Sequence, residues 1–276
     1  MKNIFKIALI VLLFSTKIII SQVIISPYIV YMDEQNKFGS MIVQNESLEP
    51  YEITMSFVFG YPVSDSLGNR TMKYVQEPTD TEPSINNWVK AFPKKFILNP
   101  KEKQTIRLMI KPPKDLSDGT YWTRIVTSSA PVQADVDSSS GGVSAKLKFV
   151  LNQVTTAIYR TKNAVTDLQI GNPKMIQDST NTYQLLYPLE RGGNTPFFGY
   201  LNLRVFNEAG EKIKDERDFL SIYYDMVRNY ILPSENFKSG KYRAELEIEF
   251  NEKEDIPESK LAKKENISNS FEFIIP

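Results

Sequence analysis

The sequence predicts an all-β protein built from two β-sandwiches in tandem, and three observations lead to this prediction. Short runs of alternating apolar and polar residues recur along the chain, and turn-forming residues separate them. Cysteine is absent, so apolar burial must hold the sandwiches together without disulfides. The 276 residues exceed the roughly 100 residues of one sandwich. We therefore expect two immunoglobulin-like β-sandwich domains in tandem.

Residues 1–21 have the pattern of a secretory signal peptide. Lys2 gives a positive start, and an apolar run follows at residues 7–14. Lys17 interrupts this apolar stretch, whereas a membrane span needs about 20 consecutive apolar residues. We expect cleavage near Ser21-Gln22 and a periplasmic protein. An uncleaved N-terminal anchor is the alternative.

The first half of the chain predicts strands separated by turns and loops. The expected strands are residues 23–32 (interrupted at Pro27), 40–45, 51–59, three strands within 92–131, and 143–151 continuing to Arg160. Residues 61–85 are polar and predict a mobile connection with at most a short strand. Trp88 and Phe92 should return the chain to the core. Residues 131–142 predict a flexible loop from their composition.

The second half predicts a strand set of its own. Its expected strands are residues 183–189, 199–206, 219–224, 229–232, 241–250 and 271–275. A hairpin turn is expected at residues 208–211, an exposed excursion at residues 253–269, and an exposed Phe197-Phe198 pair at a domain end. The strand set changes after Tyr159-Arg160. We therefore expect domains at residues 22–160 and 161–276.

The composition excludes several classes of chemistry. The absence of both cysteine and histidine excludes thiol chemistry, the common zinc sites and His-dependent catalysis. Lys+Arg and Asp+Glu balance at 33 each, so nothing directs the chain to nucleic acid or anionic membranes. Residues 191–194 form a turn pattern without the lysine of a phosphate loop. Asp135 and Asp137 are expected to be solvated. We expect no enzyme, no cofactor and no metal.

Residues 92–131 carry a resemblance to a known family. The features concerned are Leu98-Asn99-Pro100, Ile106-Arg107-Leu108, Tyr121-Trp122 and Ala130-Pro131, with Tyr159-Arg160 ending the last strand. In this order they resemble the N-terminal domain of periplasmic pilus-assembly chaperones of the PapD-like family. The resemblance covers residues 23–160 and is weak beyond them. It implies an interaction protein outside the cytoplasm whose client is an exported fibre or surface subunit.

The same resemblance singles out an alternating apolar triplet, Leu147, Phe149 and Leu151. In the family, such a triplet before the Tyr-Arg end is donated to an incomplete subunit by β-strand addition. The alternative is that the triplet supplies core residues, as in the last strand of any sandwich. Val150 and Val154 complicate the parity, because they could supply the core face instead.

The family's usual carboxylate clamp is missing from the sequence. Pilus chaperones hold the C-terminal carboxylate of the subunit with an Arg on the first strand and a Lys on the last. Tyr28 and Thr156 fall at these two positions, and neither side chain can supply a cation. Use of an usher is therefore open, as is the identity of the client. A structural or adhesive two-domain surface module is the alternative function. Exposure of the triplet beside a cleft favours the chaperone, and complete burial favours the module.

Overall fold

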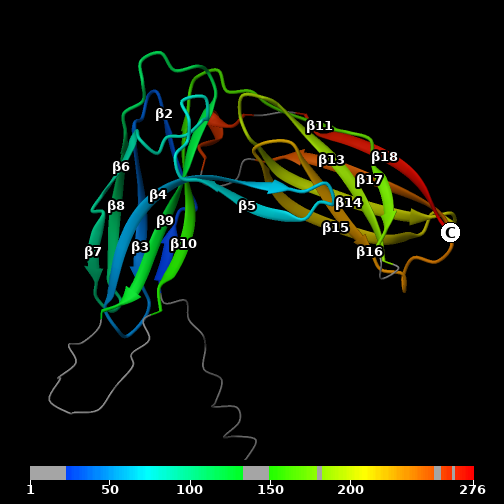
Figure 1. The fold of residues 1–276 in the computed structure, drawn as a ribbon, viewed down its shortest axis with the longest axis horizontal. Helices are drawn as coiled ribbons and strands as arrows, with labels where there is room; N and C mark the ends of the chain where they lie inside the picture. The colour runs from blue at the N-terminus through cyan, green and yellow to red at the C-terminus, as the bar shows by residue number, and fades with distance from the viewer. Residues whose placement is uncertain (1–22, 133–148, 179–181, 252–255, 263–264) are drawn as a thin grey trace, which may run out of the picture.

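The computed structural model describes residues 23–132, 149–178, 182–251, 256–262 and 265–276 (Figure 1). In these ranges the chain is β-strand, turn and loop, with a single 3-10 turn at Glu258–Lys260. No helix in the described part is long and apolar enough to cross a bilayer. The expected signal peptide and Leu147 lie outside these ranges.

The first sandwich consists of two sheets in the immunoglobulin-like strand order. One sheet has the order β1-β3-β8-β6, with bounds Val23–Ser26, Phe38–Asn45, Lys103–Ile110 and Val89–Phe92. The other sheet has the order β2-β10-β9-β4-β5, and β7 also pairs with β4. The bounds of β2, β10, β9, β4 and β5 are Ile29–Asp33, Leu151–Arg160, Thr120–Pro131, Tyr51–Ser64 and Arg70–Val75. β7 is Lys95–Leu98. The first sheet corresponds to strands A, B, E and D of an immunoglobulin domain, and β10-β9-β4 corresponds to G, F and C.

The chain changes sheets at Pro27. β1 pairs with β3 in one sheet, whereas β2 runs parallel to β10 in the other. Proline has no N–H to donate, so a strand ladder cannot continue through this position. As a result, β2 begins only at Ile29, next to Thr156 of β10. The part of β10 before Thr156 is left without this neighbour.

The second sandwich has the same general plan. In its first sheet, β13 pairs with β11, β12 and β16. The bounds of β11, β12, β13 and β16 are Thr166–Ile170, Lys174–Gln177, Tyr183–Gly193 and Met226–Leu232. Its second sheet has the order β15-β14-β17-β18, with bounds Lys212–Ile222, Phe197–Asn207, Gly240–Phe250 and Ile267–Ile275. Strands before Arg160 pair with one another, and strands after it do the same, throughout the described ranges. The boundary between residues 22–160 and 161–276 stays a prediction.

Each sandwich has its own apolar core. Along β8, alternation turns Ile106, Leu108 and Ile110 inward, while the intervening residues face outward. On β14, Leu201 and Leu203 are fully buried in the second core in the same way. The predicted period-two pattern therefore identified the principal core strands.

Three expectations about individual elements are wrong. Residues 61–85 contain the short strand β5 that the prediction allowed, but they begin with the end of β4, which continues to Ser64 and pairs with β5 in a hairpin. The strand expected at residues 219–224 is the end of β15, which begins at Lys212, and β11 and β12 were not expected. β5 is short and largely exposed, and the first part of β15 is polar, so the alternating signal is weak there. Phe92, expected in the core, is 77% exposed at the end of β6.

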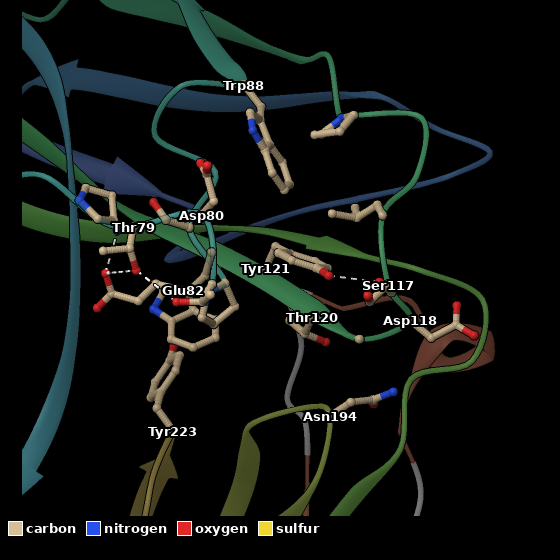
Figure 2. A pocket seen from close by; sticks show the side chains of 18 of the residues that line it. Thr79, Asp80, Glu82, Trp88, Ser117, Asp118, Thr120, Tyr121, Asn194 and Tyr223 are labelled. Atoms are coloured by element: carbon tan, nitrogen blue, oxygen red, sulfur yellow. Dashed lines mark hydrogen bonds between the residues drawn. The ribbon is translucent and has the colours of Figure 1, made fainter.

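An aromatic cluster packs the two sandwiches together. Phe59, Tyr61 and Trp122 of the first sandwich meet Phe198 and Tyr223 of the second in one buried cluster. The Trp122 and Tyr223 ring centroids are 4.7 Å apart. The expectation of an exposed Phe197-Phe198 pair is therefore wrong, because the core of the second sandwich covers one ring and the junction covers the other. A cleft opens beside this cluster (Figure 2).

The segment before β18 also reaches the first sandwich. Lys260 forms an ion pair with Asp33 at 3.0 Å, and its carbonyl accepts a hydrogen bond from the Arg160 guanidinium at 2.9 Å. Ile256 is buried. Within residues 256–262, the expected exposed excursion is thus a contact between the two sandwiches. The segment is held against the first sandwich, although it has few apolar residues, because Lys260 finds an ionic partner in Asp33 of β2.

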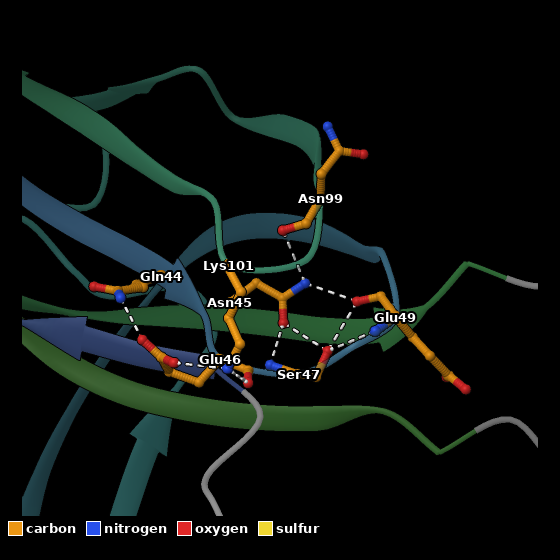
Figure 3. A network of polar contacts seen from close by, with 7 residues as sticks. All are labelled: Gln44, Asn45, Glu46, Ser47, Glu49, Asn99 and Lys101. Atoms are coloured by element: carbon orange, nitrogen blue, oxygen red, sulfur yellow. Dashed lines mark hydrogen bonds and ion pairs between the residues drawn. The ribbon is translucent and has the colours of Figure 1, made fainter.

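A buried asparagine organises the loops at one end of the first sandwich (Figure 3). Asn45 Nδ2 lies 2.7, 3.0 and 3.1 Å from the carbonyl oxygens of Glu49, Leu98 and Asn99. Its Oδ1 accepts hydrogen bonds from both the N–H and the hydroxyl of Ser47. Asn45 thereby joins the β3–β4 turn to the β7–β8 turn, with its side chain hydrogen-bonded to main-chain groups of both turns.

Candidate protein-binding edge

The first half of β10 has an open edge. β9 pairs with the whole of β10, from Leu151 to Arg160, on one side. On the other side β2 covers only Thr156 to Arg160. No strand among the described residues pairs with the segment from Leu151 to Thr155 on that side. We call this segment the open edge of β10.

The main-chain groups that face this open side can be identified from one hydrogen bond. The Thr156 N–H donates to the Tyr28 carbonyl at 2.9 Å, on the side of β2. Main-chain groups alternate in direction along a strand that is paired antiparallel, as β10 is with β9. The N–H and C=O groups of Asn152 and Val154 therefore point in the same direction as those of Thr156. They can form a ladder with an added strand.

Apolar side chains flank the open edge on both faces of the sheet. Phe149 is 77% exposed and Leu151 is 47% exposed, and Val150 and Val154 are exposed as well. Leu151 has the parity of Ala157 in the first core, while Val154 has the parity of Ile158 in the junction cluster. In this conformation none of these four apolar side chains is a core residue.

The strand at this site differs from its expected extent. Regular pairing begins at Leu151, so Phe149 precedes β10 and does not lie within it. The expected start at residue 143 and the first residue of the triplet, Leu147, lie outside the described residues. Within the described residues the apolar side chains begin at Phe149, two residues before the pairing with β9, in which Leu151 lies opposite Ser129.

The inner side of the sheet is polar near the open edge. Gln153 Oε1 and Thr155 Oγ1 are buried and have no hydrogen-bond partner among the described residues. On β9, the buried Thr127 and Ser129 lie on the same inner side. Hydroxyl and amide groups thus replace the apolar residues that line the rest of this core. A buried polar group without a hydrogen-bond partner costs free energy of folding. Among the described residues of the first sandwich, such side-chain groups are found at this end.

The two positions expected for a carboxylate clamp lie together in space. Tyr28 is 72% exposed, and its carbonyl accepts the main-chain hydrogen bond from the buried Thr156. Neither side chain carries a positive charge, as the sequence predicted. A cation nevertheless reaches this point: Arg124 of β9 donates a hydrogen bond from Nη1 to Thr156 Oγ1 at 2.5 Å.

Arg124 is held in place by neutral groups. Its Nε donates to the Gly60 carbonyl at 2.9 Å, and its guanidinium lies 4.9 Å from the centre of the Tyr223 ring. It forms no ion pair with any residue in the described ranges. Sequence reasoning missed this residue, because its place opposite Thr156 depends on the β9–β10 register. The only signal was an arginine within an otherwise apolar alternation.

The described residues contain no cluster of acidic side chains suited to a metal ion. Chemically, the site offers main-chain hydrogen bonds, exposed apolar side chains and one half-buried guanidinium. These groups suit the binding of an extended polypeptide.

Comparisons with known proteins give structural similarities only. No family model and no curated protein matches the sequence. The chain is similar to the YadV chaperone, with 13% identity over 92% of this chain and 100% of that one and a TM-score of 0.46. It is similar to a chain of the CsuC–CsuE chaperone–tip adhesion subunit complex of Acinetobacter baumannii, with 12% identity, coverages of 90% and 98%, and a TM-score of 0.46. For the CupB2 chaperone of Pseudomonas aeruginosa the identity is 8%, the coverages are 91% and 100%, and the TM-score is 0.43.

Pilus chaperones, to which the sequence shows a resemblance, are thus among the solved structures similar to this chain. What the open edge can do follows from its own geometry.

Proposed function

We propose that this chain is an exported, chaperone-like protein that binds extended segments of client proteins by adding a strand to β10. The observation that supports this most is the open edge, with main-chain groups of Asn152 and Val154 directed away from β9. An added strand would complete this ladder, and the exposed apolar side chains would enter pockets of the client. Without a client, such an edge is an aggregation hazard.

The apolar side chains are the expected source of affinity. Burying a side chain such as Phe149 or Leu151 in a partner contributes on the order of 1.5–3 kcal/mol. Their exposure is what donation to a client requires and what a core position would not give. The structural or adhesive module, which calls for burial of these residues, has no such support.

The client would be an exported fibre or surface protein. This part of the proposal is supported by the predicted signal peptide and by the resemblance to pilus chaperones, and its expected location is the periplasm. A client strand that continues the line of β2 would run parallel to β10 and end near Thr156. There the Arg124 guanidinium could receive its terminal carboxylate through charge-assisted hydrogen bonds. Binding a client in this way requires no catalytic side chains and no cofactor.

Replacement of Phe149 by glutamate tests this function. We expect Phe149→Glu to abolish co-purification of the client from the cell envelope. The free energy of unfolding should change by less than about 0.5 kcal/mol, because the side chain is exposed. Phe92→Glu is the matched control, since Phe92 is equally exposed at 77% but lies in the other sheet. It should retain the client. Loss of more than about 3 kcal/mol of stability in Phe149→Glu would show that Phe149 is a core residue and would refute donation.

A further inference from the structure

A second surface lies at the junction of the two sandwiches, in the cleft of Figure 2. The cleft has a volume of about 730 Å³, within the range of roughly 300–1,000 Å³ that is usual for ligand sites. The first sandwich contributes two loops, at residues 78–84 and 113–121, and the second contributes Arg191, Asn194 and Tyr224. The cleft shares no residue with the open edge of β10.

Aromatic rings form the walls of this junction cleft. The Trp88 indole and the Tyr121 ring project into it from adjacent elements, with ring centroids 5.3 Å apart (Figure 2). Both rings are only partly buried. The Tyr121 hydroxyl donates to the Ser117 carbonyl at 2.9 Å, which fixes the ring against its loop. The Trp88 indole N–H has no hydrogen-bond partner in the described part of the chain and is free to donate to a ligand.

The charges around the cleft are mostly negative. Four carboxylates line it, those of Asp80, Glu82, Asp115 and Asp118, against the single cation of Arg191. Within the described ranges none of the four forms an ion pair. Arg191 is already engaged, because it donates to the Gly193 carbonyl at 3.0 Å and lies 6.0 Å from the Tyr224 ring centre. A cleft with charges of one sign attracts ligands of the opposite sign.

Other rings at this junction already stack on cations. Arg124 lies over Tyr223 at 4.9 Å, and Arg191 lies near Tyr224. No cation from the described residues lies over Trp88 or Tyr121, although tryptophan is the aromatic that attracts cations most strongly. The cleft thus combines accessible aromatic faces, an available N–H donor and unpaired carboxylates.

We propose that the junction cleft binds a basic, extended segment of a partner protein, with an arginine or lysine side chain between the Trp88–Tyr121 pair and the carboxylates. The guanidinium or ammonium group stacks on the rings and pairs with Asp80 and Asp115. The indole N–H donates to a main-chain carbonyl of the segment. Since the cleft is separate from the open edge, the protein can hold this partner and an edge-bound client at the same time.

The two tryptophans of the chain, Trp88 and Trp122, both line this cleft, so intrinsic fluorescence reports on it directly. The probe is a capped peptide, Gly-Arg-Pro-Arg-Gly, and the reference is Gly-Glu-Pro-Glu-Gly. We expect a saturable fluorescence change with the arginine peptide only. Its affinity should fall at least about tenfold between low salt and 0.5 M salt, because screening weakens partly exposed charge pairs. No saturable change with the arginine peptide would overturn the proposal.

Charge variants locate the binding site. Asp80→Asn with Asp115→Asn removes two carboxylates that make no hydrogen bond to the described residues, so folding should be unaffected. We expect about a tenfold weaker affinity for the arginine peptide. Glu208→Gln with Glu235→Gln removes the same charge from exposed positions of the second sandwich and should leave the affinity unchanged. Equal losses in both double variants would indicate nonspecific charge attraction. A response to spermine at equal or lower concentration would assign the cleft to small polyamines instead of a peptide. Either result refutes the proposal.

Discussion

Arg124 is the residue whose role depends most on tertiary structure. It comes from β9, reaches across to Thr156 on β10, and rests on Tyr223 of the other sandwich. Tyr28 and Thr156, the positions that the resemblance assigns to a clamp, carry no cation because of their residue types. The sequence could not predict that a third position supplies one, because cross-strand neighbours follow from register, which the local pattern does not specify.

At this residue we predict a selective loss of binding. Arg124→Ala should weaken binding of a client with a free C-terminus by about 1.5–3 kcal/mol, the range for hydrogen bonds to charged groups. Binding of the same client with an amidated C-terminus should hardly change. Isothermal titration of both clients measures the difference. Arg204→Ala, which removes a partly exposed arginine of the second sandwich that pairs with Glu247, is the control. Equal losses for the two clients would mean that Arg124 does not bind the carboxylate.

Among the elements, the alternation of apolar and polar residues predicted the core strands but not the hairpin of β4 and β5. Strands with one buried face, such as β8, show the period-two pattern clearly. β5 is short and exposed along most of its length, and only Met72 and Tyr74 mark an apolar face in its sequence. The hairpin contacts the second sandwich instead: the Ser64 hydroxyl at the end of β4 accepts a hydrogen bond from the Val227 N–H at 2.6 Å, and Arg70 of β5 forms an ion pair with Asp218 at 3.6 Å. Elements stabilised mainly by contacts distant in sequence cannot be found from local pattern.

The turn network around Asn45 gives a prediction at the scale of elements. Asn45→Ala removes a donor from the buried Leu98 carbonyl and the acceptor of the Ser47 N–H and hydroxyl, and a buried polar group that loses its partner costs about 1–3 kcal/mol. We expect the free energy of unfolding in urea to fall by about 2–3 kcal/mol. Asn99→Ala is the matched control, because Asn99 takes part only through its main-chain carbonyl. A loss below about 0.5 kcal/mol in Asn45→Ala would contradict the network's importance.

For the whole molecule, the relation of the two sandwiches rests on the aromatic junction cluster and on the contact of Lys260 with Asp33. Burial tends to raise the pKa of Asp33, but hydrogen bonds from the Asn36 N–H, the Lys260 ammonium and the Gln35 N–H outweigh it and lower the pKa. The sequence predicted two sandwiches, and the boundary at residue 160 stays a prediction. Nothing in the sequence indicated this ion pair, whose partners are more than 200 residues apart.

The lowered pKa sets the sign of a pH effect. A carboxylate with a depressed pKa in the folded state stabilises the protein above its ordinary pKa of about 3.9, and this contribution is lost as the pH falls further. We expect Asp33→Asn to destabilise the protein at pH 6 and the difference from wild type to shrink toward pH 3. Urea unfolding at a series of pH values measures this. Asp80→Asn, at an exposed site without an ion pair in the described ranges, should show no such trend. A difference that does not change with pH would exclude the Asp33 carboxylate as its source.

The central claim is that a client adds a strand to the open edge of β10, and amide hydrogen exchange tests it most directly. In the free protein, the Asn152 and Val154 amides should exchange fast, because no described strand covers them, while the Ala157 amide within the paired ladder exchanges slowly. Binding of the client that co-purifies with wild type should slow exchange at Asn152 and Val154 by at least about a hundredfold. Unchanged exchange at these two amides in a saturated complex would contradict strand addition at β10.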